Sequence, residues 1–188
     1  QLYAGLIEGP DGYLYGTAFS GGQSNYGTAF RLTKSGTDFG VLHHFGSGSS
    51  DGRRPRAALL GDSDGWLYGT TSLGGNAGTG TVFRVQYGGA NYQVLHHFGG
   101  APFDGSSPYA DLFRAMNGLL YGTCRDGGAY GDGIIFRLAD DGTGFEVLHH
   151  FNNGRREGRY PQTRLLPAGN EGLYGVTSSG GLTNGTLF

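Results

Sequence analysis

Short apolar runs separated by glycine-rich polar segments recur along the whole chain. Between residues 57 and 98 four such runs cover 57–60, 66–71, 81–85 and 92–98, and most are rich in aromatic and β-branched side chains. Runs of this length and composition predict β-strands, which we call strands a, b, c and d. No ten-residue stretch keeps a period of 3.6 without a Gly or Pro, so we expect no helix.

The b run carries a motif, Leu67-Tyr68-Gly69-Thr70, that is repeated at a fixed interval. Its copies begin at Leu14, Leu120 and Leu173, and consecutive copies are 53 residues apart. A period near fifty residues is typical of propellers and solenoids, in which each unit buries its faces against its neighbours. The fold class expected is therefore all-β, a β-propeller of four-stranded antiparallel blades. The motif glycine is expected where a neighbouring ring approaches the backbone.

Turn residues recur at the same period and set the connections between strands. Strands a and b are joined by Asp-Gly-like pairs, which favour tight hairpins: Asp11-Gly12, Asp64-Gly65, Asn117-Gly118 and Glu171-Gly172. Gly-Gly loops join b to c, and Gly-containing turns join c to d. A proline precedes each new a strand, where a sheet begins. The chain is thus predicted to be a single propeller or half-propeller domain, with blades at about 1–53, 54–106, 107–159 and 160–188.

Together these motifs resemble the GloVer tandem repeat of bacterial proteins that are secreted or anchored at the cell surface. The resemblance rests on Asp-Gly, Leu-Tyr-Gly-Thr, Gly-Gly, Gly-Thr-x-Phe-Arg-Leu and Val-Leu-His-His-Phe, and it covers essentially the whole chain. More loosely, the pattern is similar to kelch blades. The resemblance implies an extracellular or cell-surface repeat protein and supplies no known active site. The start at Gln1 has no signal-peptide pattern, so we expect such a segment to be absent or already removed.

The strand count leaves the last blade without its outer strand. The order a-b-c-d occurs three times and is followed by a-b-c, ending with 185–188. Three arrangements are compatible with this count: a four-bladed monomer with one short blade, two chains forming an eight-bladed ring, or a piece of a longer propeller. The second makes a homodimer the expected partner, since repeated blade contacts suit cyclic symmetry.

Charge and composition exclude several classes of function. The 13 basic and 15 acidic residues give a net charge of −2, so we expect no general attraction to nucleic acid or anionic membranes. No apolar run reaches the length of a membrane span. The single cysteine, Cys124, is expected to pack in a strand, because its repeat counterparts are the small residues Ala18, Thr71 and Thr177.

Six histidines occur as adjacent pairs in the d strands, and they are candidates for a metal site. Neighbouring residues of a strand point to opposite faces, so one pair cannot chelate one ion. We expect one histidine of each pair to pack or hydrogen-bond between blades. Six of the 15 acids occupy repeated turn positions, where local backbone hydrogen bonds account for them. We therefore expect no catalytic residue, no metal and no cofactor, and an enzyme is the weakest hypothesis.

Function is expected where the repeats differ, which is on the face that carries the b–c loops and the d–a linkers. Loops on a rigid scaffold are common binding sites, and Arg, Asp and Tyr side chains suit a glycan or a protein ligand. The candidate ligand-binding residues are Tyr26, Arg53, Arg54, Arg125, Asp126, Tyr130, Asp132 and Tyr160. The alternative function is a structural module that self-assembles.

Overall fold

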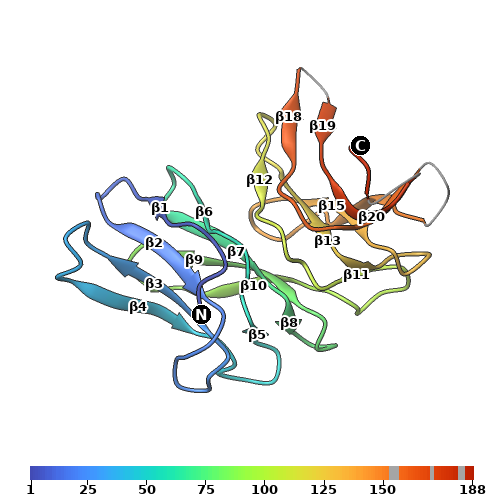
Figure 1. Ribbon diagram of the computed structural model, residues 1–188. Helices are drawn as coiled ribbons and strands as arrows, with labels where there is room; N and C mark the ends of the chain where they lie inside the picture. The colour runs from blue at the N-terminus through green and yellow to red at the C-terminus, as the bar shows by residue number, and fades with distance from the viewer. Residues whose placement is uncertain (153–156, 170–171, 182–184) are drawn as a thin grey trace.

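The computed structural model describes residues 1–152, 157–169, 172–181 and 185–188. Throughout these residues the chain is all-β, its paired strands are antiparallel, and no helix is present. Consequently no described helix is long and apolar enough to cross a membrane. Figure 1 shows the repeats lying side by side in chain order, from the N-terminal sheet at the left to the C-terminal strands at the upper right.

Each of the first three repeats forms one four-stranded sheet in the order a-b-c-d. The first sheet contains β1 (Ile7–Glu8), β2 (Leu14–Ala18), β3 (Thr28–Leu32) and β4 (Phe39–His44). The second contains β6 (Leu60–Gly61), β7 (Trp66–Thr71), β9 (Thr81–Gln86) and β10 (Gln93–His97). The third contains β12 (Phe113–Arg114), β13 (Leu120–Cys124), β15 (Ile134–Leu138) and β16 (Glu146–His150). The predicted b, c and d strands are confirmed to within a residue or two in the second repeat.

The described part of the fourth repeat holds three of the four strand positions. Strands β18 (Leu166–Ala168) and β19 (Gly172–Tyr174) form the a–b hairpin. The predicted turn there includes Glu171, which lies outside the described residues. The c position is occupied by the last residues, because Gly175 and Phe188 exchange two backbone hydrogen bonds of 3.0 Å and Val176 bridges Leu187.

The a strands are shorter than the sequence predicts. The run 57–60 is wrong as a strand assignment, since β6 begins only at Leu60. Upstream, the carbonyl of Ala57 accepts a hydrogen bond from Thr17 Oγ1 at 2.9 Å, and the N–H of Ala58 donates to Asp111 Oδ1 at 2.6 Å. These backbone groups bond to the first and third repeats, so they are not available for a ladder within their own sheet.

The d–a linkers form strand pairs that the sequence did not predict. Each linker pairs with the segment that follows the b strand of the next repeat, in three two-stranded sheets. The pairs are β5 (Gly52–Arg53) with β8 (Leu73–Gly74), β11 (Gly105–Ser106) with β14 (Asp126–Gly127), and β17 (Gly158–Pro161) with β20 (Thr177–Gly180). The linkers are thereby fixed over the face that carries the candidate site.

Apolar layers between successive sheets form the core. The layer between the first two sheets includes Tyr15, Phe45 and Leu67, and the next layer includes Tyr68 and Phe136. Neighbouring motif residues Leu67 and Tyr68 therefore contribute to opposite layers, as expected for adjacent residues of a strand. This arrangement, in which the second sheet is covered on both faces by its neighbours, is β-propeller-like.

Glycine in the repeated motif lets an aromatic ring lie on the backbone. A Cβ atom added to Gly69 would stand 2.6 Å from Phe83 Cζ, and one added to Gly122 would stand 2.5 Å from Phe136 Cζ. Both distances are too short for a carbon contact. The expected close approach is confirmed. Cys124 is fully buried, as its small counterparts indicated, and burial raises the pKa of its thiol.

Candidate functional site

The paired histidines of the d strands serve the contact between sheets. His43 stacks on Tyr92 of the second sheet with ring centroids 3.5 Å apart and planes 6° apart, and its Nε2 lies 3.0 Å from Asp51 Oδ2. His44, on the opposite face of the strand, lies beside Gly22 in the b–c loop of its own repeat. The described residues contain no group of three His, Cys, Asp or Glu side chains that could hold a metal ion.

Three of the predicted residues come together at the first linker. The guanidinium of Arg53 lies 4.5 Å from the ring centroid of Tyr26, and that of Arg54 lies 5.6 Å from the same centroid and 4.9 Å from that of Phe19. Arg54 has a left-handed φ of 60°, and its N–H donates to the Tyr26 carbonyl at 2.8 Å. The linker backbone thus holds both arginines against the b–c loop.

A second group of predicted residues gathers around Tyr160. Arg125 pairs with Asp126 at 2.9 Å and lies 4.8 Å from the ring centroid of Tyr160, while Arg159 lies 5.0 Å from the same ring. Tyr160 also has a left-handed φ, 62°, and donates its N–H to the Asp132 carbonyl at 2.8 Å. Cation–π contacts of this length orient the guanidinium planes.

Arg56 connects the two groups. Its guanidinium lies 4.9 Å from the ring centroid of Tyr3, 4.8 Å from that of Phe19 and 4.6 Å from that of Tyr109. Tyr109 in turn lies 5.9 Å from Arg125. The whole set forms one series, the arginine–aromatic row, which consists of Tyr3, Phe19, Tyr26, Arg53, Arg54, Arg56, Tyr109, Arg125, Arg159 and Tyr160.

The structure places the remaining predicted residues differently. Tyr130 is 65% exposed and lies outside the row. The main-chain carbonyl of Asp132 accepts the hydrogen bond from the Tyr160 N–H, and within the described residues its side chain makes no hydrogen bond or ion pair with the row. Sequence reasoning missed Tyr3, Arg56 and Tyr109, although this position varies among the repeats, with Gln162 in the fourth, and the rule of variable positions could have found them.

A cavity of about 320 Å³ opens beside Arg56, lined by residues that precede the a strands of all four repeats. Its lining comprises Tyr3, Ala4, Gly5, Arg56, Tyr109, Ala110, Asp111, Gln162 and Arg164. We call it the central cavity, because the segments before the a strands of the four repeats meet there. Residues about 53 positions apart in the sequence therefore share one site.

The central cavity offers more positive than negative charge. Arg56 and Arg164 contribute two guanidinium groups, and Asp111 is the one carboxylate among its lining residues. The Nε of Arg56 is buried and has no hydrogen-bond partner within the described structure. An unpaired buried donor is costly and is satisfied when an acceptor binds. A single carboxylate does not provide the acid and base pair of a glycosidase.

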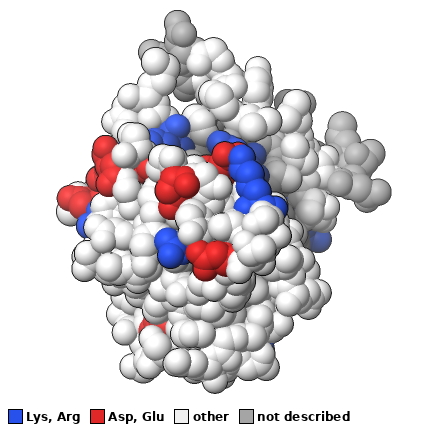
Figure 2. All heavy atoms as spheres, turned by 90° about the vertical axis from the view of Figure 1, so that its left-hand side faces the viewer, with Lys and Arg blue, Asp and Glu red and all other residues white. Residues whose placement is uncertain are grey.

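The outer surface of the first repeat lacks a patch of one charge. Figure 2, which views the molecule from the side of this repeat, shows acidic and basic side chains mixed over the upper part and sparse over the lower part. The first repeat also carries an exposed ion pair between Lys34 and Glu8, at 2.7 Å. Such a surface has no long-range attraction for a polyanion.

Comparison with known proteins gives a family and a fold. The Gloeobacter/Verrucomicrobia repeat family matches residues 1–188. No curated protein matches the sequence.

Solved structures resemble the chain at low sequence identity. A structure of a nidogen/laminin complex is 18% identical with a TM-score of 0.58, covering 89% of this chain and 52% of that one. A protein of unknown function from Dyadobacter fermentans is 12% identical with a TM-score of 0.57, covering 94% and 61%. A putative TolB from Agrobacterium tumefaciens is 14% identical with a TM-score of 0.51, covering 84% and 52%. The chain spans about half to three fifths of their length, and the likeness concerns the fold alone.

Proposed function

Because this chain belongs to the Gloeobacter/Verrucomicrobia repeat family, we propose that it is a non-catalytic β-propeller repeat module that binds a carboxylate-bearing glycan in its central cavity. The repeat family and the β-propeller-like neighbours support the module. The ligand, the absence of catalysis and an extracellular or cell-surface location are parts of the proposal. Its main support is Arg56, whose buried Nε lacks a partner.

Arg56 is positioned to receive an anionic oxygen. Contacts with Tyr3, Phe19 and Tyr109 restrict its guanidinium, so little side-chain entropy remains to be lost when a ligand binds. Arg164 adds a second positive charge at the same cavity. A planar guanidinium binds a carboxylate through two parallel hydrogen bonds, which a neutral sugar hydroxyl cannot reproduce.

The other lining groups suit the hydroxyls and the ring of a sugar. Gln162 and Asp111 provide donor and acceptor groups, and Tyr3 is 50% exposed, leaving ring surface for an apolar sugar face. The arginine–aromatic row extends from the cavity toward the linkers, so neighbouring sugar units have further contacts. Clefts of this kind, with a few convergent polar groups, are typical ligand sites.

Calorimetry with a short polyuronate and its neutral, carboxyl-reduced counterpart tests the proposal. We expect Arg56→Ala to weaken binding of the polyuronate at least about tenfold, since a charge-assisted hydrogen bond contributes about 1.5–3 kcal/mol. Arg31→Ala is the matched control, because Arg31 lies over Tyr13 and does not line the cavity. Equal binding of the neutral sugar, or an unchanged affinity of Arg56→Ala, would contradict it. Tight binding of polyglutamate alone would favour a protein ligand.

Self-assembly is a second candidate function, supported by apolar side chains left open at both ends of the row of sheets. Leu6 and Phe39 of the first repeat are 44% and 60% exposed, and Tyr174 and Leu187 of the fourth are 54% and 72% exposed. In the second repeat the counterparts of Leu6, Tyr174 and Leu187, which are Leu59, Tyr68 and Val82, are at most 3% exposed. A homodimer that completes a ring would join these two faces.

The mass in solution tests this second candidate. We expect a two-chain species that Phe39→Glu dissociates and that the control Phe103→Glu, at a 62% exposed loop residue, leaves intact. A strictly monomeric mass at high concentration would exclude it.

A further inference from the structure

The second and third sheets are each joined to the preceding sheet by an aromatic residue directly before the d strand, which enters a slot between the two sheets. Tyr92 enters the first slot and stacks on His43. Its ring centroid lies 6.1 Å from that of Phe45 and 5.7 Å from that of Phe83. Its hydroxyl donates to Asp51 Oδ1 at 2.8 Å. The slot thus combines a stacking histidine, two aromatic walls and a carboxylate.

The second slot is filled in the same way. Phe145 stacks on His96 with ring centroids 3.6 Å apart and planes 6° apart, and it contacts Phe98 and Phe136 at 6.0 and 5.7 Å. His96 Nε2 lies 3.2 Å from Asp104 Oδ2. Because both slots hold an aromatic ring stacked on a histidine, a third slot with the same walls should also bind an aromatic ring.

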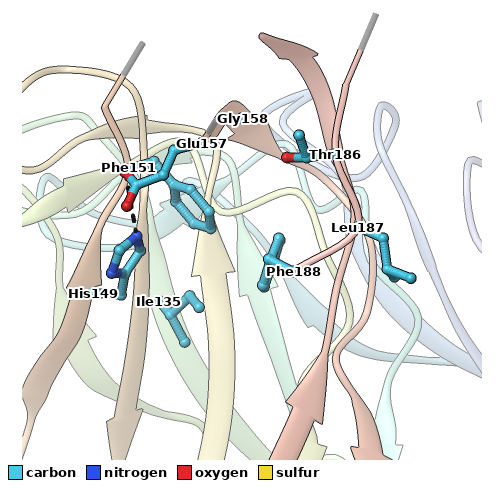
Figure 3. A pocket seen from close by; sticks show the side chains of 8 residues that line it. All are labelled: Ile135, His149, Phe151, Glu157, Gly158, Thr186, Leu187 and Phe188. Carbon is cyan, nitrogen blue, oxygen red and sulfur yellow. Dashed lines mark ion pairs between the residues drawn. The ribbon is translucent and has the colours of Figure 1, made fainter. Parts of the chain in front are cut away.

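A third copy of the slot exists between the third and fourth repeats, and no aromatic side chain of the described residues fills it. It is a cavity of about 250 Å³ lined by Ile135, His149, Phe151, Glu157, Gly158, Thr186, Leu187 and Phe188. Figure 3 shows His149 and Glu157 on one side of the opening and Phe188 with Leu187 on the other. Four of the lining residues, His149, Phe151, Glu157 and Phe188, are the repeat counterparts of His43, Phe45, Asp51 and Phe83 at the first slot.

The walls of this third slot already have the geometry of the filled ones. The centroids of Phe151 and Phe188 are 4.9 Å apart, against 5.1 Å for both Phe45–Phe83 and Phe98–Phe136. His149 meets Phe151 edge to face at 4.8 Å, the same distance as His96 and Phe98.

What differs is that the polar side of the third slot is uncovered. The side chain of His149 is 41% exposed, whereas those of His43 and His96 are 14% and 18% exposed. His149 Nε2 lies 3.9 Å from Glu157 Oε2, an oxygen that is buried and has no hydrogen-bond partner in the described structure. At the first slot the corresponding carboxylate accepts the tyrosine hydroxyl.

A strand edge lies open beside the slot. Gly175 and Thr177 hydrogen-bond to Phe188 and Thr186, so these bonds use the side of the last strand that faces the segment from Gly175 to Thr177. In an antiparallel pair the intervening residue, Leu187, points its N–H and C=O to the other side. At the filled slots that side is occupied by the d strand, as in the pairing of β3 with β4.

We propose that this third slot is a docking site for an outer strand of the same repeat pattern, led by a tyrosine, which adds to the edge at Leu187. The tyrosine ring stacks on His149 between Phe151 and Phe188, and its hydroxyl donates to Glu157. The occupant is an extended segment of the form Tyr-x-Val-Leu-His, whose backbone supplies strand hydrogen bonds. This site is separate from the central cavity, so the inference does not depend on the glycan.

Titration of the chain with three labelled heptapeptides tests the docking site by fluorescence anisotropy. The peptides are Tyr-Gln-Val-Leu-His-His-Phe, from residues 92–98, and its variants with Phe or Ala in the first position. We expect the affinity order Tyr, Phe, Ala, with at least about a tenfold loss from Tyr to Ala, since the buried ring supplies much of the contact. A rise in the thermal unfolding midpoint with the Tyr peptide is the second readout.

Variants of the chain distinguish this slot from other surfaces. His149→Ala should weaken the Tyr peptide several-fold, and Glu157→Ala should abolish the preference for Tyr over Phe. His150→Ala is the control, because that ring lies on the opposite face and accepts a hydrogen bond from Ala129 N–H. Equal binding of the Ala-led peptide, no binding of any peptide, or unchanged binding by His149→Ala would overturn the proposal.

Discussion

Asp51 is a buried carboxylate with partners from two neighbouring sheets. Its side chain is 5% exposed and accepts hydrogen bonds from His43, Ser47 and Tyr92. Burial by itself would raise the pKa of Asp51, but the hydrogen bonds outweigh burial and hold the pKa well below its usual range. The stabilisation is therefore present above the unfolded-state pKa of about 3.9 and is lost as the pH falls toward the folded-state pKa.

Acid titration of stability tests this role of Asp51. We expect the free energy of unfolding to decline as the pH is lowered below about 5 and Asp51→Asn to reduce that dependence. At neutral pH the same substitution should cost about 1–3 kcal/mol, because it removes the charge from a buried network. Urea unfolding at several pH values measures both effects. Asp64→Asn, at an exposed turn, is the control, and an equal loss there would contradict the account.

Gly122 shows how strongly the packing limits a single position. Gly122→Ala would place a methyl group 2.5 Å from Phe136 Cζ and 2.9 Å from Leu112 Cδ2. We expect a loss of about 1–3 kcal/mol in the free energy of unfolding, since well-packed cores do not absorb an extra carbon. Gly88→Ala is the matched control, because nothing lies within 4 Å of its added Cβ and its φ is not left-handed. It should change stability by less than about 0.5 kcal/mol.

The linkers carry backbone strain at one repeated position. Arg54, Ser107 and Tyr160 are repeat counterparts, and their φ angles are 60°, 55° and 62°. In each case the N–H donates at 2.8 Å to a carbonyl of the preceding repeat, that of Tyr26, Thr79 or Asp132. Left-handed backbone is unfavourable for residues with a Cβ. Contacts between sheets therefore maintain a conformation that these residues would not adopt alone.

Two adjacent serines test this interpretation with opposite signs. We expect Ser107→Gly to stabilise the chain by about 0.5–1 kcal/mol, because glycine adopts a left-handed φ without strain. Ser106→Gly should destabilise it by a similar amount, since Ser106 lies in β11, where glycine has only an entropic cost. Thermal unfolding of both variants measures the difference. Destabilisation of the chain by both substitutions would contradict the role assigned to Ser107.

The elements that were predictable from sequence are those whose partners lie nearby in the chain. Strands b, c and d are short runs rich in aromatic and β-branched side chains, and glycine-containing turns join them. The side-chain pattern and the turn residues therefore predict where these strands lie. Ala57 and Ala58 read as strand by composition, but their backbone groups bond to Thr17 and Asp111 in other repeats. The linker strand β5 was missed because it is two residues long and pairs with β8.

At the scale of the whole molecule, the period predicted the β-propeller-like stack of sheets but only part of the site. Variable loop positions indicated Arg53, Arg54 and Arg125, and the structure brings them into the arginine–aromatic row. Arg56 was missed because its importance depends on Tyr3 and Tyr109, which approach it only when several sheets are stacked. The sequence pattern of a single repeat therefore does not predict the contact of Arg56 with Tyr3 and Tyr109.

The central cavity is also the place where the account can be tested most directly. The proposed function requires that a polyuronate contact residues from separate repeats at one point. Amide chemical shifts of the isotope-labelled chain, followed during titration with a short polyuronate, locate the bound ligand residue by residue. We expect saturable shifts centred on Arg56, Tyr109 and Asp111, all of which line the cavity. Saturation without shifts at these residues, or shifts confined to loops such as that of Tyr130, would contradict the central claim.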